Sequence, residues 1–183
     1  MTDKQRTLIM IKPDAVERKL SGKILNRFEE AGFTIVKLRK GRLSQELVKK
    51  QYRSIETQLT GMGKKTIESM TVAGKAQEIQ TLFGTIDPYK IGEQLIEWNR
   101  KFMSSSDVIA MILERENAVL KGRELIGKTD PSMAVNGTIR GDFGEDSILK
   151  ANLERRATRN LVHASDEEGA VIETKLFEEE FFN

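Results

Sequence analysis

The chain has 183 residues, enough for one stable domain, and its 38% hydrophobic and 32% charged residues are typical of a globular protein. It has no cysteine and one histidine, which excludes disulfides, thiolate catalysis and metal sites built from Cys or several His. Any metal must therefore bind through oxygen ligands, which favours Mg²⁺. The formal net charge is only +2 and aromatic residues make up 6%, so we do not expect a nucleic-acid-binding protein.

No segment has the pattern of a targeting signal or a membrane helix. The apolar run Thr7–Ile11 is short and is broken by Lys12 and Pro13. No apolar stretch approaches the roughly 20 residues that a membrane helix needs. We therefore expect a cytoplasmic protein that does not contact a membrane.

The first half of the chain shows two strands and two helices, followed by a less regular stretch. The apolar spacing predicts a strand over 7–12, a helix from Ser21 to near Gly32, a strand over 33–38 and a helix from Ser44 through Tyr52. Residues 54–92 are rich in glycine and predict a surface insertion with short helices near 65–70 and 76–83. A helix over 92–103 and a central strand over 107–113 follow.

The second half alternates again. We expect a basic helix over 117–126, a loop over 129–140, a second insertion within 144–158, a short strand ending at residue 163 and a helix starting at 166. The order predicts an α+β fold of the ferredoxin-like βαββαβ type, an antiparallel four-stranded sheet covered by helices. The whole chain, 1–183, is expected to form one domain with insertions within about 54–92 and 144–158.

The segment Gly61-Met-Gly-Lys-Lys-Thr66 partly resembles a phosphate-binding P-loop. That motif needs a glycine five residues before its Gly-Lys pair, where this chain has Gln58, and Ser or Thr after the pair, where it has Lys65. No strong strand precedes the segment. We therefore reject a P-loop.

The single histidine, His163, closes an apolar pair at the predicted end of a strand. An imidazole is mostly neutral at pH 7, so a ring nitrogen can attack an electrophile. Taken alone, a histidine at a strand end is more often a packed or capping residue. The functional interpretation depends on polar residues elsewhere in the chain.

Several segments carry polar residues that a core does not require. Lys12 ends an apolar strand, where it could reach solvent or bind a phosphate. Arg140 lies among three glycines and could bind phosphate oxygens through its planar guanidinium. Arg123 and Thr129 could belong to an ordinary exposed surface, and Tyr52 could be a packing residue on its helix. Spacing leaves the direction of Asn160, three residues before the histidine, open.

Together, these segments resemble the nucleoside diphosphate kinase family. The matching pieces, in the family's order, are Thr7-Leu-Ile-Met-Ile-Lys-Pro-Asp-Ala-Val16, Gly122-Arg-Glu-Leu-Ile-Gly-Lys-Thr-Asp-Pro131, Gly137-Thr-Ile-Arg-Gly-Asp-Phe143 and Asn160-Leu-Val-His-Ala-Ser-Asp166. The resemblance implies ping-pong transfer of a γ-phosphate from a nucleoside triphosphate, usually ATP, to a nucleoside diphosphate. It also implies a homo-oligomer.

The resemblance assigns roles to individual positions. His163 matches the family nucleophile, Ser165 matches the serine beside it, and Glu173 is the candidate for the glutamate that orients the ring. Mg²⁺ is implied mainly on the nucleotide phosphates, with Asp166 as a partner through water. The positions implied to hold the phosphates and the ribose are Lys12, Tyr52, Arg123, Thr129, Arg140 and Asn160.

The chain departs from the family pattern at two positions and by its two insertions. Counting back from the strand over 107–113 puts Leu95 where the family has an aromatic residue that stacks on the base. Asn136 replaces a proline in a loop used for subunit packing. The main alternative to an active kinase is a non-catalytic nucleotide-binding regulatory module on the same fold, because a fold does not guarantee activity.

Overall fold

The computed structural model describes residues 4–183 and contains one antiparallel sheet of four strands in the order β2-β3-β1-β4. The strands are β1 (Gln5–Ile11), β2 (Thr34–Arg42), β3 (Asp107–Arg115) and β4 (Val162–Ala164). The central pair β1 and β3 is in register from Gln5 opposite Arg115 to Ile11 opposite Ile109. This order and the helical connections confirm the predicted ferredoxin-like α+β fold.

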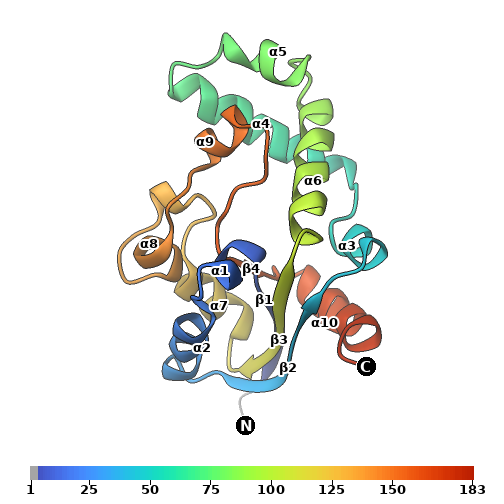
Figure 1. The fold of residues 1–183 in the computed structure, drawn as a ribbon, viewed down its shortest axis with the longest axis vertical. Helices are drawn as coiled ribbons and strands as arrows, with labels where there is room; N and C mark the ends of the chain where they lie inside the picture. Colours follow the sequence, from blue (N-terminus) through green and yellow to red (C-terminus); the bar gives the residue numbers. More distant parts are fainter. Residues whose placement is uncertain (1–3) are drawn as a thin grey trace.

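Helices cover both faces of the sheet (Figure 1). Alternate side chains of a strand point to opposite faces, so Ile9 and Ile11 of β1 belong to one apolar cluster and Leu8 and Met10 to the other. The first cluster includes residues of α1 (Pro13–Glu17), α2 (Ser21–Glu30) and α7 (Ala118–Ile126). The second includes residues of α3 (Gln45–Gln51) and α10 (Gly169–Glu180).

The first insertion contains longer helices than the sequence predicts. It forms α4 (Glu56–Val72) and α5 (Glu78–Phe83), followed by α6 (Pro88–Met103), and rises above the sheet in Figure 1. An added Cβ at Gly63 would lie 1.9 Å from the Pro88 carbonyl oxygen, and one at Gly92 would lie 2.1 Å from that of Leu59. These glycines therefore let α4 and α6 pack closely, whereas the sequence predicted only short helices near 65–70 and 76–83 in this stretch.

The insertion also has its own small core, whose buried members are Met70, Ile79, Phe83, Ile91 and Leu95. The rejected P-loop segment lies inside α4, where no phosphate-binding loop exists.

The stretch after α7 is more ordered than predicted. It contains a 3₁₀ turn (Pro131–Met133) and the helices α8 (Ile139–Phe143) and α9 (Ile148–Leu153). Residue Arg140 therefore lies on a helix and not in a loop. Helix α9 contacts α4, so the two stretches predicted to be insertions pack together (Figure 1).

Two predicted helix starts, Ser21 and Asp166, differ in the structure, whereas the one at Ser44 is confirmed. Ser44 caps α3, since its side chain accepts a hydrogen bond from the Leu47 amide. Ser21 is the first residue of α2 and makes no capping bond. The last helix begins at Gly169 rather than at Asp166, whose Oδ1 accepts from the Gly169 amide at 2.7 Å.

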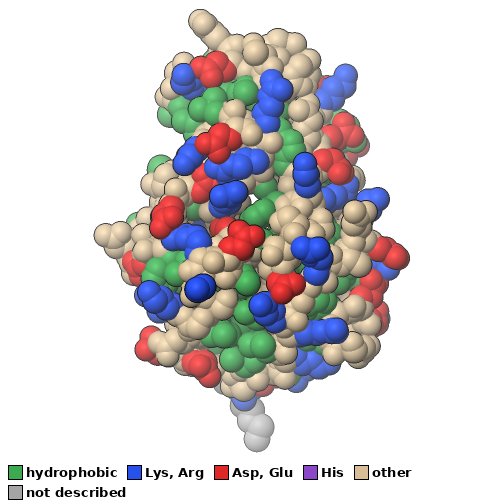
Figure 2. All heavy atoms as spheres, viewed as in Figure 1, with side chains coloured by type: hydrophobic (Ala, Val, Ile, Leu, Met, Phe, Trp, Pro, Cys, Tyr) green, Lys and Arg blue, Asp and Glu red, His purple; other side chains and the backbone are tan. Residues whose placement is uncertain are grey.

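No helix of the described residues, 4–183, combines the length and the apolar character needed to cross a membrane. On the face shown in Figure 2, the Lys and Arg side chains are interspersed with Asp and Glu.

Candidate active site

The structure gathers most of the predicted site residues around one cavity of about 520 Å³. They come from segments far apart in the sequence, which the sheet and the helices α7 and α8 bring together. The predicted residues that line the cavity are Lys12, Tyr52, Arg123, Thr129, Arg140, Asn160 and His163.

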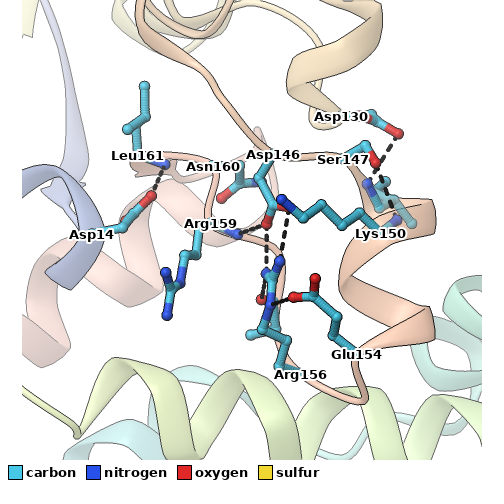
Figure 3. Close-up of polar contacts among 12 residues, drawn as sticks. Asp14, Asp130, Asp146, Ser147, Lys150, Glu154, Arg156, Arg159, Asn160 and Leu161 are labelled. Atoms are coloured by element: carbon cyan, nitrogen blue, oxygen red, sulfur yellow. Dashed lines mark hydrogen bonds and ion pairs between the residues drawn. The ribbon is translucent and has the colours of Figure 1, made fainter.

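A sharp bend before β4 places Asn160 beside Lys12. Leu161 has a φ of +68°, which few residues other than glycine adopt, and its amide donates to Asp14 Oδ2 at 3.1 Å (Figure 3). Lys12 Nζ then donates to Asn160 Oδ1 at 2.8 Å, and Asn160 Nδ2 donates to the Thr129 carbonyl at 2.9 Å. The regular strand assumed in the sequence analysis does not extend to Asn160, which is why spacing could not orient it.

The second insertion is anchored next to this bend. The buried Asp146 accepts from Arg156 at 2.6 and 2.9 Å and from the Arg159 amide at 2.8 Å (Figure 3). The chain therefore returns from the insertion at a fixed point immediately before Asn160.

The His163 ring is held through one of its two nitrogens. Nε2 lies 3.0 Å from Glu173 Oε2, and Ser165 Oγ donates a short hydrogen bond to the same oxygen. Because Glu173 accepts through Nε2–H, the neutral ring has its lone pair on Nδ1. Nδ1 makes no hydrogen bond within residues 4–183, and the ring lines the cavity.

The sequence analysis missed one residue of this cluster, Gln51. Its Nε2 lies 3.1 Å from His163 Nε2, and its hydrogen bond to Glu173 is one of those that lower the pKa of that carboxyl. Burial alone would raise the pKa of Glu173, but the bonds from His163, Ser165 and Gln51 outweigh it. Gln51 is the last residue of α3 and is buried. A polar residue on the buried side of a predicted helix was the signal that could have identified it.

Tyr52 packs against the histidine from the other side of the cluster. The two ring centroids are 6.0 Å apart, and the Tyr52 hydroxyl is buried without a hydrogen-bond partner in the described part of the chain. Arg100 fixes the backbone there by donating to the Tyr52 carbonyl.

The two arginines of the cavity differ in their contacts. Arg140 is buried, and its three guanidinium nitrogens donate to the carbonyls of Asn160, Gly127 and Val162 at 2.9, 2.9 and 2.6 Å. Arg123 is exposed, and its guanidinium makes no hydrogen bond within the described chain. Burial, and then the charge of Arg123, lower the pKa of Arg140 to about 10, so Arg140 remains cationic at pH 7.

Lys12 is the most perturbed cation of the cavity. Burial and, to a lesser extent, the neighbouring Arg140 charge lower its pKa to about 8. The buried Asp14 opposes this shift, and its own pKa is raised by burial. Three cations that line one cavity, two of them buried, favour an anionic ligand with several oxygens, such as a polyphosphate.

Four predicted site residues do not line this cavity, and two of them, Ser165 and Glu173, bond to each other beside the histidine ring. Leu95 is buried in the core of the first insertion and faces a second, neighbouring cavity. Asp166 is exposed and caps α10. No group of three or more His, Asp or Glu side chains placed to bind a metal occurs among residues 4–183.

Comparison with known proteins agrees with this geometry. The family model for nucleoside diphosphate kinase matches residues 5–91 and 89–181, almost the whole chain. The chain belongs to the nucleoside diphosphate kinase family. It is therefore a phosphotransferase that binds nucleotides, and family members work with a divalent metal ion.

The alignments with relatives cover most of the length of both proteins. A nucleoside diphosphate kinase from Pyrobaculum aerophilum is 40% identical over 162 residues, which are 88% of this chain and 87% of that protein. One from Methanocaldococcus jannaschii is 35% identical, over 98% of this chain and 99% of that protein.

Solved structures of nucleoside diphosphate kinases have the same fold as this chain. The crystal structure of an NDP kinase from Pyrobaculum aerophilum superposes with a TM-score of 0.92 at 36% identity, covering 99% of this chain and 100% of that one. A Borrelia burgdorferi nucleoside diphosphate kinase, solved as a transition-state mimic with vanadate and ADP, has a TM-score of 0.73 at 27% identity over 98% and 91% of the two chains.

Proposed function

We propose that His163 Nδ1 carries the phosphoryl group between the two half-reactions of this kinase. The observation that supports this assignment most strongly is the ring itself: Glu173 holds Nε2, and the ring lines a cavity together with Lys12, Arg123 and Arg140. An oriented nucleophile beside three cations is what phosphoryl transfer requires.

In the first half-reaction, the Nδ1 lone pair attacks the γ-phosphorus of a nucleoside triphosphate such as ATP. The bond from that phosphorus to the β–γ bridging oxygen breaks, and the nucleoside diphosphate leaves with those electrons. The ring becomes a cation, and the Glu173 carboxylate stabilises it through Nε2–H. In the second half-reaction, a terminal oxygen of another nucleoside diphosphate attacks the phosphohistidine and Nδ1 regains its lone pair.

The remaining residues bind and position the nucleotide. Arg123 is placed to bind the transferring phosphoryl group, because its guanidinium makes no hydrogen bond within the described chain. Arg140 holds the bend before β4 and contributes its charge to the cavity. Lys12, Asn160 and Thr129 form one hydrogen-bonded chain along the wall, suited to the ribose and the inner phosphates.

We propose that the divalent metal is Mg²⁺ and that it arrives on the nucleotide phosphates, since no cluster of protein carboxylates is present among residues 4–183. When bound, it would neutralise phosphate charge. Asp166 does not line the cavity, and its carboxylate accepts a hydrogen bond from the Gly169 amide at the start of α10.

We also propose that the chain assembles as a homo-oligomer in the cytoplasm. Leu38 supports self-association, because it is 46% exposed on the edge strand β2. Light scattering gives the mass in solution.

Steady-state kinetics with ATP and GDP tests the proposed function. A covalent phosphoenzyme predicts parallel lines in double-reciprocal plots of rate against ATP at several GDP concentrations. Intersecting lines would indicate a ternary complex with direct transfer. Binding of ATP without any transfer would favour the non-catalytic nucleotide-binding module instead.

Replacing Glu173 with glutamine is expected to slow phosphorylation of the enzyme about 10- to 100-fold, the scale by which a charged partner strengthens a hydrogen bond over a neutral one. The neutral amide still accepts from Nε2–H but does not stabilise the cationic ring. Rapid-mix measurement of phosphoenzyme formation gives the rate. Glu179→Gln, on the exposed part of the same helix, is the matched control; equal rates for both variants would mean that another group orients the ring.

Nucleotide affinity is expected to fall as the pH rises above about 8. The pKa of Lys12 is lowered to about 8, so the free protein loses this cation in that range, whereas a bound phosphate favours the protonated form. The loss should approach about tenfold per pH unit. Calorimetry of ADP binding between pH 7 and 9.5 measures it; Lys12→Arg should remove the dependence, and an unchanged profile in that variant would rule out Lys12 as the source.

A further inference from the structure

Lys12 is a buried cation whose hydrogen-bond partner is neutral. It is 7% exposed, and its ammonium makes one hydrogen bond within residues 4–183, to the Asn160 amide oxygen at 2.8 Å. A buried charge without an opposite charge nearby is costly, and an amine escapes that cost by losing its proton. A lysine that has to be cationic at this position therefore needs a carboxylate close by.

The side chains around Lys12 supply little negative charge. The titratable and charged groups that line the nucleotide cavity with it are Tyr52, Arg123, Glu124, Lys128, Arg140 and His163. Lys65 and Arg156 line the neighbouring cavity that Lys12 also faces. Glu124 is the one carboxylate in these two sets, and it is exposed and pairs with Lys121 at 2.8 Å. The buried counter-charge must therefore come from outside both cavities.

Asp14, on the first turn of α1, is that counter-charge. It is 4% exposed, and it stabilises the Lys12 cation, whereas Arg140 destabilises it. Burial raises the pKa of the Asp14 carboxyl, but the Lys12 charge and the backbone amides of Leu161, Ala15 and Asp14 itself favour the ionised form.

Hydrogen bonding explains only half of the Asp14 carboxylate. Oδ2 accepts from the Leu161 amide at 3.1 Å and holds the bend before β4 (Figure 3). Oδ1 is buried and has no hydrogen-bond partner within residues 4–183. An asparagine could accept the same bond from Leu161 without burying a charge. The second oxygen therefore indicates that the negative charge itself has a use.

The bend before β4 fixes Asp14 relative to Lys12. The Lys12 amide donates to the Leu161 carbonyl at 2.8 Å, and the Leu161 amide donates to Asp14. The Val162 amide donates to the Asn160 carbonyl at 2.8 Å, which closes a tight turn around Leu161. Because Asn160 also accepts from the Lys12 ammonium, the carboxylate and the ammonium are both attached to this one turn.

We propose that Asp14 is a positioning residue that keeps the Lys12 ammonium charged, so that Lys12 can bind nucleotide phosphates at neutral and slightly alkaline pH. Asp14 does not line the nucleotide cavity. It lines a separate cavity of about 200 Å³, so it acts through Lys12 and not by touching the nucleotide. The inference rests on the proposed function, because that function assigns phosphate binding to Lys12.

The variant Asp14→Asn removes the charge and keeps an acceptor for the Leu161 amide. We expect the pKa of Lys12 to fall by about one unit or more, the usual effect of losing a nearby opposite charge. Near pH 6, where Lys12 is protonated in both proteins, the variant should bind ADP as tightly as the wild type or more tightly. Near pH 8.5 it should bind about tenfold more weakly, because more of its Lys12 has lost the proton.

Control variants distinguish this effect from damage to the turn. Glu17→Gln removes an exposed carboxylate of the same helix and should leave the pH profile unchanged. Adding Asp14→Asn to Lys12→Arg should not alter the pH dependence, because arginine keeps its charge. A damaged turn would instead weaken binding at every pH and in both backgrounds. Asp14→Ser is a second neutral variant if Asp14→Asn does not fold.

The charge of Lys12 can also be measured without a nucleotide. In protein labelled with ¹³C-lysine, the Cε signal of Lys12 is the one that disappears in Lys12→Arg. Its shift between pH 6 and pH 10 gives the pKa in the wild type and in the neutral variants of Asp14. This measurement requires neither nucleotide binding nor phosphoryl transfer.

The outcomes distinguish the inference from the proposed function. A lower pKa of Lys12 in the neutral variants, with ADP profiles that cross the wild-type profile, supports the inference even if transfer through His163 proves wrong. An unchanged pKa of Lys12 would overturn the inference and leave the proposed function intact. A lower pKa with an unchanged ADP profile would overturn the inference together with phosphate binding by Lys12.

Discussion

The variant His163→Ala is expected to lose phosphoryl transfer by a factor on the order of 10⁶, the scale seen when a covalent nucleophile is removed. No other histidine exists in the sequence to replace it. The ring is 20% exposed at the cavity wall, and its partners Glu173 and Ser165 still bond to each other without it. The Tm should therefore change little.

A coupled assay of nucleoside triphosphate formation gives the rate, and binding of ADP provides the control. The variant should still bind ADP, since the cations of the cavity are untouched. Turnover near the wild-type rate would refute the nucleophile assignment, whereas loss of ADP binding would point to misfolding.

The second large effect concerns the two arginines. Arg123→Ala is expected to slow phosphorylation by about 10²–10³-fold, as for other single electrostatic groups that stabilise a transition state. Its Tm should stay near the wild-type value because the guanidinium of Arg123 makes no hydrogen bond within the described chain. Arg123→Lys keeps the charge and should recover part of the rate.

Arg140→Ala is expected to slow the reaction and also to destabilise the fold. It leaves three backbone carbonyls without their donor, at about 1–3 kcal/mol for each one that stays dry. Rapid-mix phosphorylation and thermal unfolding of both variants make the comparison. Equal losses of Tm would contradict the division between a binding arginine and a positioning arginine.

The fold was largely predictable from the sequence because its sheet residues follow simple patterns. The buried runs of β1 and β3, and the helices between the strands, have clear periodicity. The first insertion was not predictable in detail. Gly61 and Gly63 normally indicate irregular structure, and only the contact of Gly63 with Pro88 explains a glycine inside α4.

The candidate site was predictable only where a motif identified its residues. Motif segments named His163, Lys12 and Arg140, although spacing could not foresee that Arg140 bonds to three carbonyls. Gln51 was missed because its only local signal, a polar residue on the buried side of a helix, does not say what it contacts. Its importance comes from the His163–Glu173 pair that lies across from it.

The most direct test of the central claim is a phosphoenzyme experiment with γ-labelled ATP and Mg²⁺, followed by a chase with unlabelled GDP. We expect acid-labile label on the wild type, none on His163→Ala, and transfer of the label to GTP during the chase. Wild-type protein that binds ATP but takes up no label, or label that persists on His163→Ala, would contradict transfer through this histidine.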